Sequence, residues 1–234
     1  MSIRRPYITG RLSSFMSSKG TRRWYLNGRR HREDGPAIEY ANGNHEWYLN
    51  GRRHREDGPA VERRASSLKK WRIEVATLSI PEGVLHREWW RNGRRHREDG
   101  PALEEPDGTR WWYLNGKLSR KDRPAVERAD GSREWWINGK CHREDRPAVE
   151  RADGDREWWI NGKCHREDGP AVERADGSRE WWINGERHRE DGPAVEKADG
   201  SREWWFKGRR LQVSSLEEFT TEIRLLQIEE VQES

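Results

Sequence analysis

The hydrophobic positions of this chain recur in short clusters with a period of 23 residues. One cluster joins two aromatic residues and an aliphatic residue to Asn-Gly, as in Trp135 to Gly139, and a Pro-Ala-Val cluster follows from Pro147. Charged residues fill the stretches between them. Aromatic and β-branched residues favour pleated strands, and Asn-Gly after such a run is a strong signal of a β-hairpin. The pattern therefore predicts a repeated hairpin, and a period of this length is typical of repeat arrays.

The aromatic cluster and its turn occur in eight copies. The tryptophans that open the cluster are Trp24, Trp47, Trp89, Trp112, Trp135, Trp158, Trp181 and Trp204. The turn glycines are Gly28, Gly51, Gly93, Gly116, Gly139, Gly162, Gly185 and Gly208. Glycine is present in all eight copies, whereas Asn is replaced once, by Lys207. This pattern fits a turn that needs positive φ. Since adjacent side chains of a strand face opposite sides, we expect an aromatic row on each face, either packed as the core or exposed to a ligand.

The second shared segment reads His-Arg-Glu-Asp-Gly-Pro-Ala, as at His165 to Ala171. Its Pro would open a short second strand, Ala-Val-Glu-Arg-Ala, at a first position where a missing N–H costs little. An Asp-Gly turn would then lead into the next copy. We expect an all-β fold: an elongated, solenoid-like antiparallel meander of about eight 23-residue β-hairpin repeats with a C-terminal capping helix.

The segments at 134–142 (EWWINGKCH) and 127–132 (ERADGS) resemble the MORN repeat. That repeat also has a period near 23 residues, a Trp, then Asn-Gly, a basic residue and His, and an Asp-Gly before the next unit. Glu134 stands where the MORN pattern has Gly, and Arg-Glu-Asp follows His142 in place of Gly-x-Gly, so the repeat is a variant. The resemblance implies a hairpin array that acts as a protein scaffold or assembly module. It also implies membrane association as an alternative, because this role has been suggested for MORN repeats in general.

Three segments differ from the array, which spans 22–210. Residues 1–21 are rich in Arg and Ser and carry no acid, which predicts a basic, disordered arm; a transit peptide or contact with an anionic surface are the alternatives. Residues 63–87 lose both shared segments, so we expect a degenerate copy that still forms strands, or else a partner-binding loop. Residues 211–234 combine a Ser-x-x-Glu capping box with apolar residues at helical spacing, which predicts an amphipathic helix that caps the array or binds a partner.

The composition argues for a thin, repeated core. Only 31% of residues are hydrophobic, 38% are charged and the mean hydropathy is −1.29, as in many disordered chains. The 15 Trp residues at fixed intervals argue against disorder. Residues 1–23 carry six basic residues and no acid, residues 211–234 carry six Glu and one Arg, and the array between them is close to balanced. The basic excess therefore lies in the N-terminal arm and not in a basic groove, so nucleic acid is not an expected partner.

The two cysteines, Cys141 and Cys164, hold the same position in adjacent copies. Equivalent residues two strands apart would be separated by about 9.6 Å, which is too far for a disulfide. No run is apolar enough for a signal sequence or a membrane span. These features favour an intracellular, cytoplasmic protein, with organelle targeting by the basic arm as the alternative.

His, Arg, Glu and Asp occur together in most copies, a combination that suggests metal binding or acid–base catalysis as hypotheses. A catalytic set is needed once, whereas a structural turn is needed in every copy, and Ser119 replaces His in one of them. No zinc-ligand spacing, phosphate loop or nucleophile elbow occurs. We expect no enzyme, metal or cofactor, but a scaffold for a protein partner. Anionic lipid binding through the arm and stacking of single-stranded nucleic acid or another ligand on exposed Trp rows are the alternatives.

Overall fold

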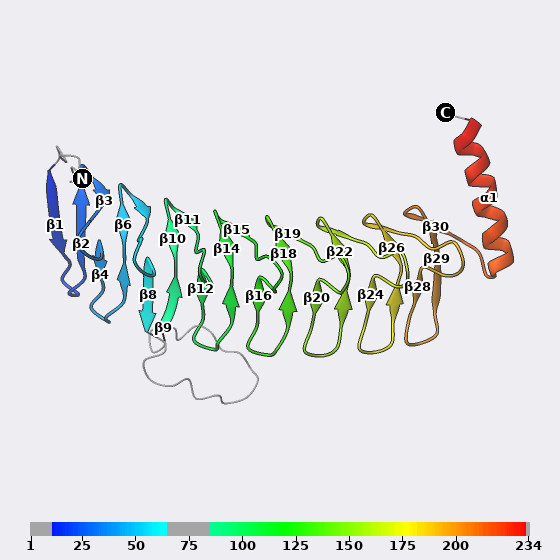
Figure 1. Cartoon of the computed structure of the whole chain (residues 1–234), viewed down its shortest axis with the longest axis horizontal. Helices are drawn as coiled ribbons and strands as arrows, with labels where there is room; N and C mark the ends of the chain where they lie inside the picture. Colours follow the sequence, from blue (N-terminus) through cyan, green and yellow to red (C-terminus); the bar gives the residue numbers. More distant parts are fainter. Residues whose placement is uncertain (1–10, 65–84, 233–234) are drawn as a thin grey trace. The chain divides into compact units, whose positions relative to one another are not determined.

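The computed structural model describes residues 11–64 and 85–232 and divides into two compact units, residues 1–117 and 118–234. Each unit is built almost entirely from short antiparallel strands joined by tight turns (Figure 1). The helix of the described ranges, α1 (Leu216–Gln232), belongs to the second unit. The expected all-β class, with an antiparallel meander of hairpins and a C-terminal helix, is confirmed.

The main sheet of the first unit is a meander in which each strand pairs antiparallel with the next strand named here. Its strands are β1 (Leu12–Met16), β2 (Arg22–Leu26), β4 (Ile38–Glu39), β5 (His45–Glu46), β8 (Val61–Arg64), β9 (Leu85–Glu88), β12 (Leu103–Glu104) and β13 (Arg110–Trp111). The main sheet of the second unit follows the same plan. Its strands are β16 (Val126–Glu127), β17 (Arg133–Glu134), β20 (Val149–Glu150), β21 (Arg156–Glu157), β24 (Val172–Glu173), β25 (Arg179–Glu180), β28 (Val195–Glu196) and β29 (Arg202–Phe206).

A second set of strands flanks the Asn-Gly turns. Two-residue hairpins pair β6 (Tyr48–Leu49) with β7 (Arg52–Arg53), β10 (Trp90–Arg91) with β11 (Arg94–Arg95), β18 (Trp136–Ile137) with β19 (Lys140–Cys141), β22 (Trp159–Ile160) with β23 (Lys163–Cys164) and β26 (Trp182–Ile183) with β27 (Glu186–Arg187). In the first copy β3 (Arg29–Arg30) pairs with β2, and in the last β30 (Arg209–Leu211) pairs with β29. The remaining strands are β14 (Tyr113–Leu114) and β15 (Lys117–Leu118), which spans the boundary between the units.

Most inner copies make two antiparallel pairings, whereas the pattern predicted a single hairpin. The strand before Asn-Gly is interrupted at its first tryptophan, so that β17 joins the main sheet while β18 pairs with β19. At the interruption Trp135 donates its backbone N–H to the C=O of Ala148 at 2.8 Å and accepts the N–H of His142 at 3.0 Å. Its backbone polar groups are therefore satisfied, as buried or half-buried backbone requires. The His-Arg-Glu-Asp segment then carries the chain back to the main sheet.

The Asn-Gly turns have positive φ at both central residues, which defines the type I′ hairpin turn. Asn50 has φ of 51° and Gly51 of 81°, and the eight turn glycines lie between 75° and 89°. Lys207, in place of Asn, has φ of 46°. A Cβ makes that conformation costly for residues other than Gly, Asn and Asp. The Asn-Gly pattern thus reports a backbone requirement at two positions, not one.

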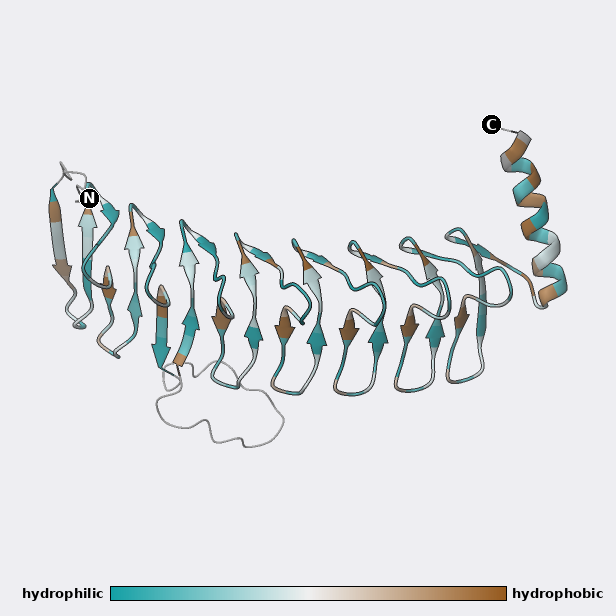
Figure 2. Ribbon diagram, viewed as in Figure 1, coloured by the Kyte–Doolittle hydropathy of each residue, from teal (hydrophilic) through white to brown (hydrophobic). Residues whose placement is uncertain are grey.

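The core of each copy consists of small aliphatic residues from the Pro-Ala-Val strands. Its alanines, all at 0% exposure, are Ala37, Ala60, Ala102, Ala125, Ala148, Ala171 and Ala194. The aliphatic residue after each alanine is also buried, and in Figure 2 these strands appear brown beside teal strands that carry Arg and Glu. The opening tryptophans are half-buried, except Trp204, which is 8% exposed. They flank the aliphatic core and do not replace it.

The histidine of each copy holds the turn of the next copy. In the second unit His142 accepts the backbone N–H of Asn161 through Nδ1 at 3.1 Å, and the N–H of Gly162 donates to the C=O of Cys141 at 2.8 Å. Ser119 accepts the equivalent bond from Asn138 through Oγ at 3.2 Å. The position requires a hydrogen-bond acceptor, which explains why Ser can replace His.

Residues 12–26 correct the prediction of a disordered arm over 1–21. β1 pairs with β2 over five residues, from Leu12 opposite Leu26 to Met16 opposite Arg22. This pairing satisfies the backbone groups along one edge of β2, which would otherwise offer a template for association. Composition missed the strand because its stability comes from the partner strand and not from its own hydrophobicity. Residues 1–10 lie outside the described residues.

The described ends of the stretch 63–87 pair directly with each other. They belong to β8 and β9, which pair from Val61 opposite Glu88 to Arg64 opposite Leu85. The copies on either side are in direct contact, since the N–H of Asn92 donates to Nδ1 of His54 at 3.2 Å. The copies that open with Trp47 and Trp89 are therefore adjacent in the main sheet. Both expectations for 63–87, a degenerate copy and a partner-binding loop, fall largely on residues 65–84, outside the described residues.

The helix α1 covers the last hairpin of the second unit, as predicted for a cap. Its buried residues join strand residues in one cluster: Trp204, Phe206, Leu211, Phe219 and Ile223. The N-terminal cap is formed, because the N–H of Glu218 donates to Oγ of Ser215 at 3.2 Å, and the Glu218 carboxylate accepts the N–H of Ser214 at 2.8 Å. The cap thereby removes from water the aromatic surface that ends the repeat.

Candidate functional site

The arginine of each His-Arg-Glu-Asp segment stacks on the first tryptophan of its own copy. The guanidinium carbon of Arg166 lies 4.1 Å from the centroid of the Trp158 ring. Its Nη1 donates to the C=O of Pro170 at 3.2 Å and to Glu173 at 3.1 Å. The same stacking occurs for Trp24 with Arg32, Trp47 with Arg55, Trp89 with Arg97, Trp135 with Arg143 and Trp181 with Arg189. This arginine joins the ring, the Pro segment and the main sheet.

The acidic and imidazole groups of the same segment are used in similar contacts in most copies. Nε of Arg166 donates to Asp168 at 3.0 Å, and this hydrogen bond lowers the pKa of the Asp168 carboxyl. The histidine binds the following turn. Within 11–64 and 85–232 no three His, Cys, Asp or Glu side chains are placed to hold a metal ion.

A second row of side chains combines aromatic rings with carboxylates. In each copy of the second unit from Trp135 onward, a glutamate accepts the indole N–H of the second tryptophan. These pairs, termed the Glu–Trp row, are Glu134 with Trp136 (2.9 Å), Glu157 with Trp159 (3.0 Å), Glu180 with Trp182 (3.1 Å) and Glu203 with Trp205 (3.0 Å). All of these side chains are half-buried. Each copy therefore presents a ring and a carboxylate at the same place.

One side chain from the strand after Asn-Gly lies between consecutive rings of the row. Where it is Arg187, the guanidinium carbon is 5.1 Å from the Trp182 ring and 5.2 Å from the Trp205 ring. Its Nε and Nη2 donate to Glu180 at 3.2 Å and 3.0 Å. The arginine is thus placed between two aromatic rings and bound by a carboxylate.

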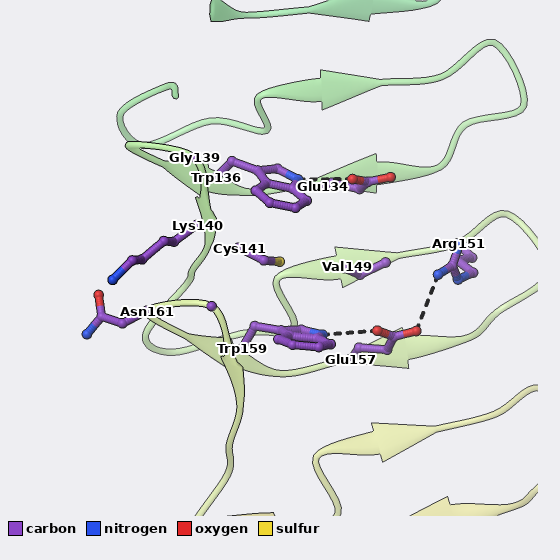
Figure 3. Close-up of a pocket in the computed structure, with 11 residues that line it drawn as sticks. Glu134, Trp136, Gly139, Lys140, Cys141, Val149, Arg151, Glu157, Trp159 and Asn161 are labelled. Carbon is purple, nitrogen blue, oxygen red and sulfur yellow. Dashed lines mark hydrogen bonds and ion pairs between the residues drawn. The ribbon is translucent and has the colours of Figure 1, made fainter. Parts of the chain in front are cut away.

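At Cys141 the side chain between the rings is a thiol, and a pocket of about 450 Å³ opens there. Figure 3 shows Cys141 between the levels of the Trp136 and Trp159 rings, with the carboxylates of Glu134 and Glu157 on one side of the pocket. The Glu157 carboxylate also accepts a hydrogen bond from Arg151 at 3.3 Å. The pocket has aromatic walls, two carboxylates on one side and a small thiol within it, and Lys140 and Arg151 also line it.

The thiols themselves are poorly suited to reactivity. Cys141 and Cys164 are free cysteines, and both are buried. Burial, helped by the nearby carboxylates of Glu134 and Glu157, raises the pKa of Cys141 to about 12. The thiolate is the nucleophile and metal ligand of cysteine chemistry. At neutral pH Cys141 is therefore a small apolar group that shapes the pocket.

The first unit contains a buried ion pair that the pattern did not indicate. His86 contacts Glu105 through Nδ1 at 2.7 Å and Glu88 through Nε2 at 2.9 Å. Burial opposes the charged ring, but these two carboxylates outweigh it and raise the pKa of His86 to about 9. Burial likewise opposes ionisation of Glu88, but hydrogen bonds from His86 and Arg95 lower its pKa to about 2. The pair is ionised at neutral pH and ties β9 to the end of β12.

The predicted residues and the accessible chemistry only partly coincide. Six of the eight opening tryptophans lie under arginines, whereas Trp204 packs against Phe219 of α1. The turn glycines form exposed turns. The second tryptophans and their glutamates are also half-buried, and in this row Cys141 and Cys164 lie between consecutive rings. The available signal was the exchange of Arg for Cys at a single repeat position, but its meaning depends on which rings lie on either side.

Comparison of the chain with protein-family models and with curated proteins yields no match. Over the ranges that the structure describes, no helix has the length and apolar character needed to cross a membrane. The geometry of the repeat is therefore the basis for assigning a function.

Proposed function

We propose that this chain is a non-enzymatic scaffold in which an array of variant MORN repeats binds a protein partner. The observation that carries the proposal is the Glu–Trp row, which offers a half-buried ring beside a carboxylate in successive copies of the second unit. Repeat proteins use such regular surfaces to bind extended partners. The groups that could serve catalysis are engaged in similar structural contacts in most copies, which is the use expected of scaffold residues.

The charge around the rings favours protein over lipid or nucleic acid. Stacking of a single strand on Trp136 or Trp159 would bring its phosphates close to Glu134 and Glu157, and ssDNA-binding grooves are basic instead. Anionic lipid headgroups would meet the same carboxylates. A protein surface with cationic side chains complements the row.

The test compares three forms of the chain for partner capture from extracts of the source cells, followed by cross-linking. Deletion of 135–180 removes two whole copies and joins Glu134 to Trp181, which keeps the repeat in register. We expect the partner to be lost on this deletion and retained on deletion of 1–10, which removes Arg4 and Arg5. Circular dichroism confirms that both deletion forms are folded.

The same three forms are assayed with phosphatidylserine vesicles and a single-stranded oligonucleotide. Vesicle binding that disappears with residues 1–10, without any protein partner that depends on the array, would contradict the scaffold and support the membrane alternative. Oligonucleotide binding that falls steeply with salt would contradict it in favour of nucleic acid.

A further inference from the structure

In the Glu–Trp row, the guanidinium of Arg187 shows how a cationic group can be bound between two rings. Arg187 lies between Trp182 and Trp205 and donates two hydrogen bonds to Glu180. A guanidinium is planar, stacks on aromatic faces and binds carboxylates through a fork of donors. Two rings and a carboxylate at this spacing therefore form a guanidinium site, here filled from within the chain.

The first unit repeats the arrangement with different rings. The guanidinium carbon of Arg95 lies 5.3 Å from the Trp90 ring and 5.6 Å from the Tyr113 ring, and its Nε donates to Glu88 at 3.0 Å. Arg53 lies 5.2 Å from the same Trp90 ring. The site is thus a property of the repeat position and not of one local sequence.

Around Cys141 the same surroundings recur without the arginine. Trp136 and Trp159 take the places of the two rings, and Glu134 takes the place of the carboxylate. A thiol is too short to fill the space that arginine fills elsewhere, which accounts for the pocket of about 450 Å³. That volume lies within the ~300–1,000 Å³ of typical ligand sites. Cys164 stands in the same position of the next copy, packed against Trp159 and Trp182.

The carboxylates of the pocket already have basic neighbours, since Arg128 binds Glu134 and Arg151 binds Glu157. This does not block a second cation. In the last copy Glu203 has Arg187 at 3.9 Å, Lys197 at 3.6 Å and Arg210 at 3.9 Å. A carboxylate of this row therefore accommodates more than one cation at once.

We propose that the pocket at Cys141 binds the guanidinium of an arginine side chain presented by a protein partner. The flat cation would lie between Trp136 and Trp159 and donate to Glu134, as Arg187 does within the chain. Lysine fits less well, because an ammonium is a compact, strongly hydrated charge without a stacking face. A phosphate or carboxylate ligand would meet the acidic side of the pocket.

This inference rests on the proposed function for the carrier of the arginine, but the pocket can be tested without any partner. The probe is N-acetyl-L-arginine amide, with N-acetyl-L-lysine amide as the matched control. Binding is followed by the NMR signals of the indole N–H groups, assigned with single Trp→Phe variants. The Trp136 signal is a direct reporter, because that N–H donates to Glu134.

We expect a saturable shift of the Trp136 signal with the arginine amide, with a dissociation constant on the order of 1 mM, since one side chain buries little surface. The lysine amide should bind at least about tenfold more weakly. Glu134→Gln should weaken the arginine amide by a similar factor. No saturable shift, or equal shifts with both amides, would overturn the proposal.

Two substitutions exchange the residue between the rings and act in opposite directions. Cys141→Arg should fill the pocket from within, as arginine does in other copies, and abolish the Trp136 shift. Arg187→Cys should create a new site and a new arginine-dependent shift at Trp205. If Cys141→Arg does not fold, the Arg187→Cys variant still tests the proposal. The absence of a new arginine-dependent shift at Trp205 would then contradict it.

The amide titration tests the arginine pocket and the partner capture tests the scaffold, so each proposal can be refuted without the other. A partner that binds through residues 135–180 while the amide does not bind would leave the scaffold supported and the arginine pocket refuted. Amide binding without a captured partner would leave the pocket supported and the scaffold refuted.

Discussion

The arginine stacked on each opening tryptophan should be a main source of stability, and Arg166→Met tests this. Arg166 stacks at 4.1 Å on Trp158 and donates at 3.2 Å to Pro170 and at 3.1 Å to Glu173. Its side chain is 23% exposed. Methionine retains much of the apolar stem, so the substitution removes mainly the planar charge and its hydrogen bonds.

The expected loss follows from these contacts. A partly desolvated cation–π contact contributes about 1–2 kcal/mol, and hydrogen bonds of a charged donor contribute about 1.5–3 kcal/mol. We assign nothing to the exposed Asp168. Because the terms are not additive, Arg166→Met should lower the free energy of unfolding by about 2–4 kcal/mol.

The assay is urea unfolding followed by far-UV circular dichroism, with Arg179→Met as the matched control. Arg179 is an exposed strand residue of the next copy, and its loss should change stability by less than about 0.5 kcal/mol. Arg166→Lys, which keeps the charge without the planar face, should fall between the two. Equal free energies of unfolding for Arg166→Met and Arg179→Met would refute the claim that Arg166 stabilises the repeat.

Three further outcomes test other parts of the structure. Raising the pH should destabilise the first unit, because the stabilisation by charged His86 is complete below about pH 6.5 and is lost as the pH passes about 9. The urea midpoint measured as a function of pH tests this. The same pH dependence in His86→Gln would show that another group causes it. Lys207→Asn should stabilise the last turn by about 0.5–1 kcal/mol, because Asn tolerates positive φ better than Lys; an unchanged melting temperature would show that the turn is not strained. Ending the chain at Ser214 should expose Trp204 and Phe206 to water and red-shift the tryptophan emission, whereas an unchanged spectrum would mean that α1 is not a cap.

The local interactions were readable from the chain because they depend on neighbouring residues. Asn-Gly specifies a type I′ turn through the backbone freedom of Gly51 and its equivalents, and the capping box at Ser215 specifies the start of α1. The period of 23 residues and the alternation of aromatic and Pro-Ala-Val clusters indicated an all-β repeat. Each of these signals acts within a few residues, so a sequence pattern can carry it.

Other features depend on which strands become neighbours, and only the tertiary structure decided them. β1 exists because β2 offers it an edge, and β8 pairs with β9 although residues 65–84 separate the two strands in the sequence. The same holds for the candidate site: the sequence shows Cys141 where other copies have Arg, but it does not show that two tryptophan rings and a glutamate surround that position. A pocket arises there because the walls come from adjacent copies, whereas the residue that would fill it comes from one copy alone.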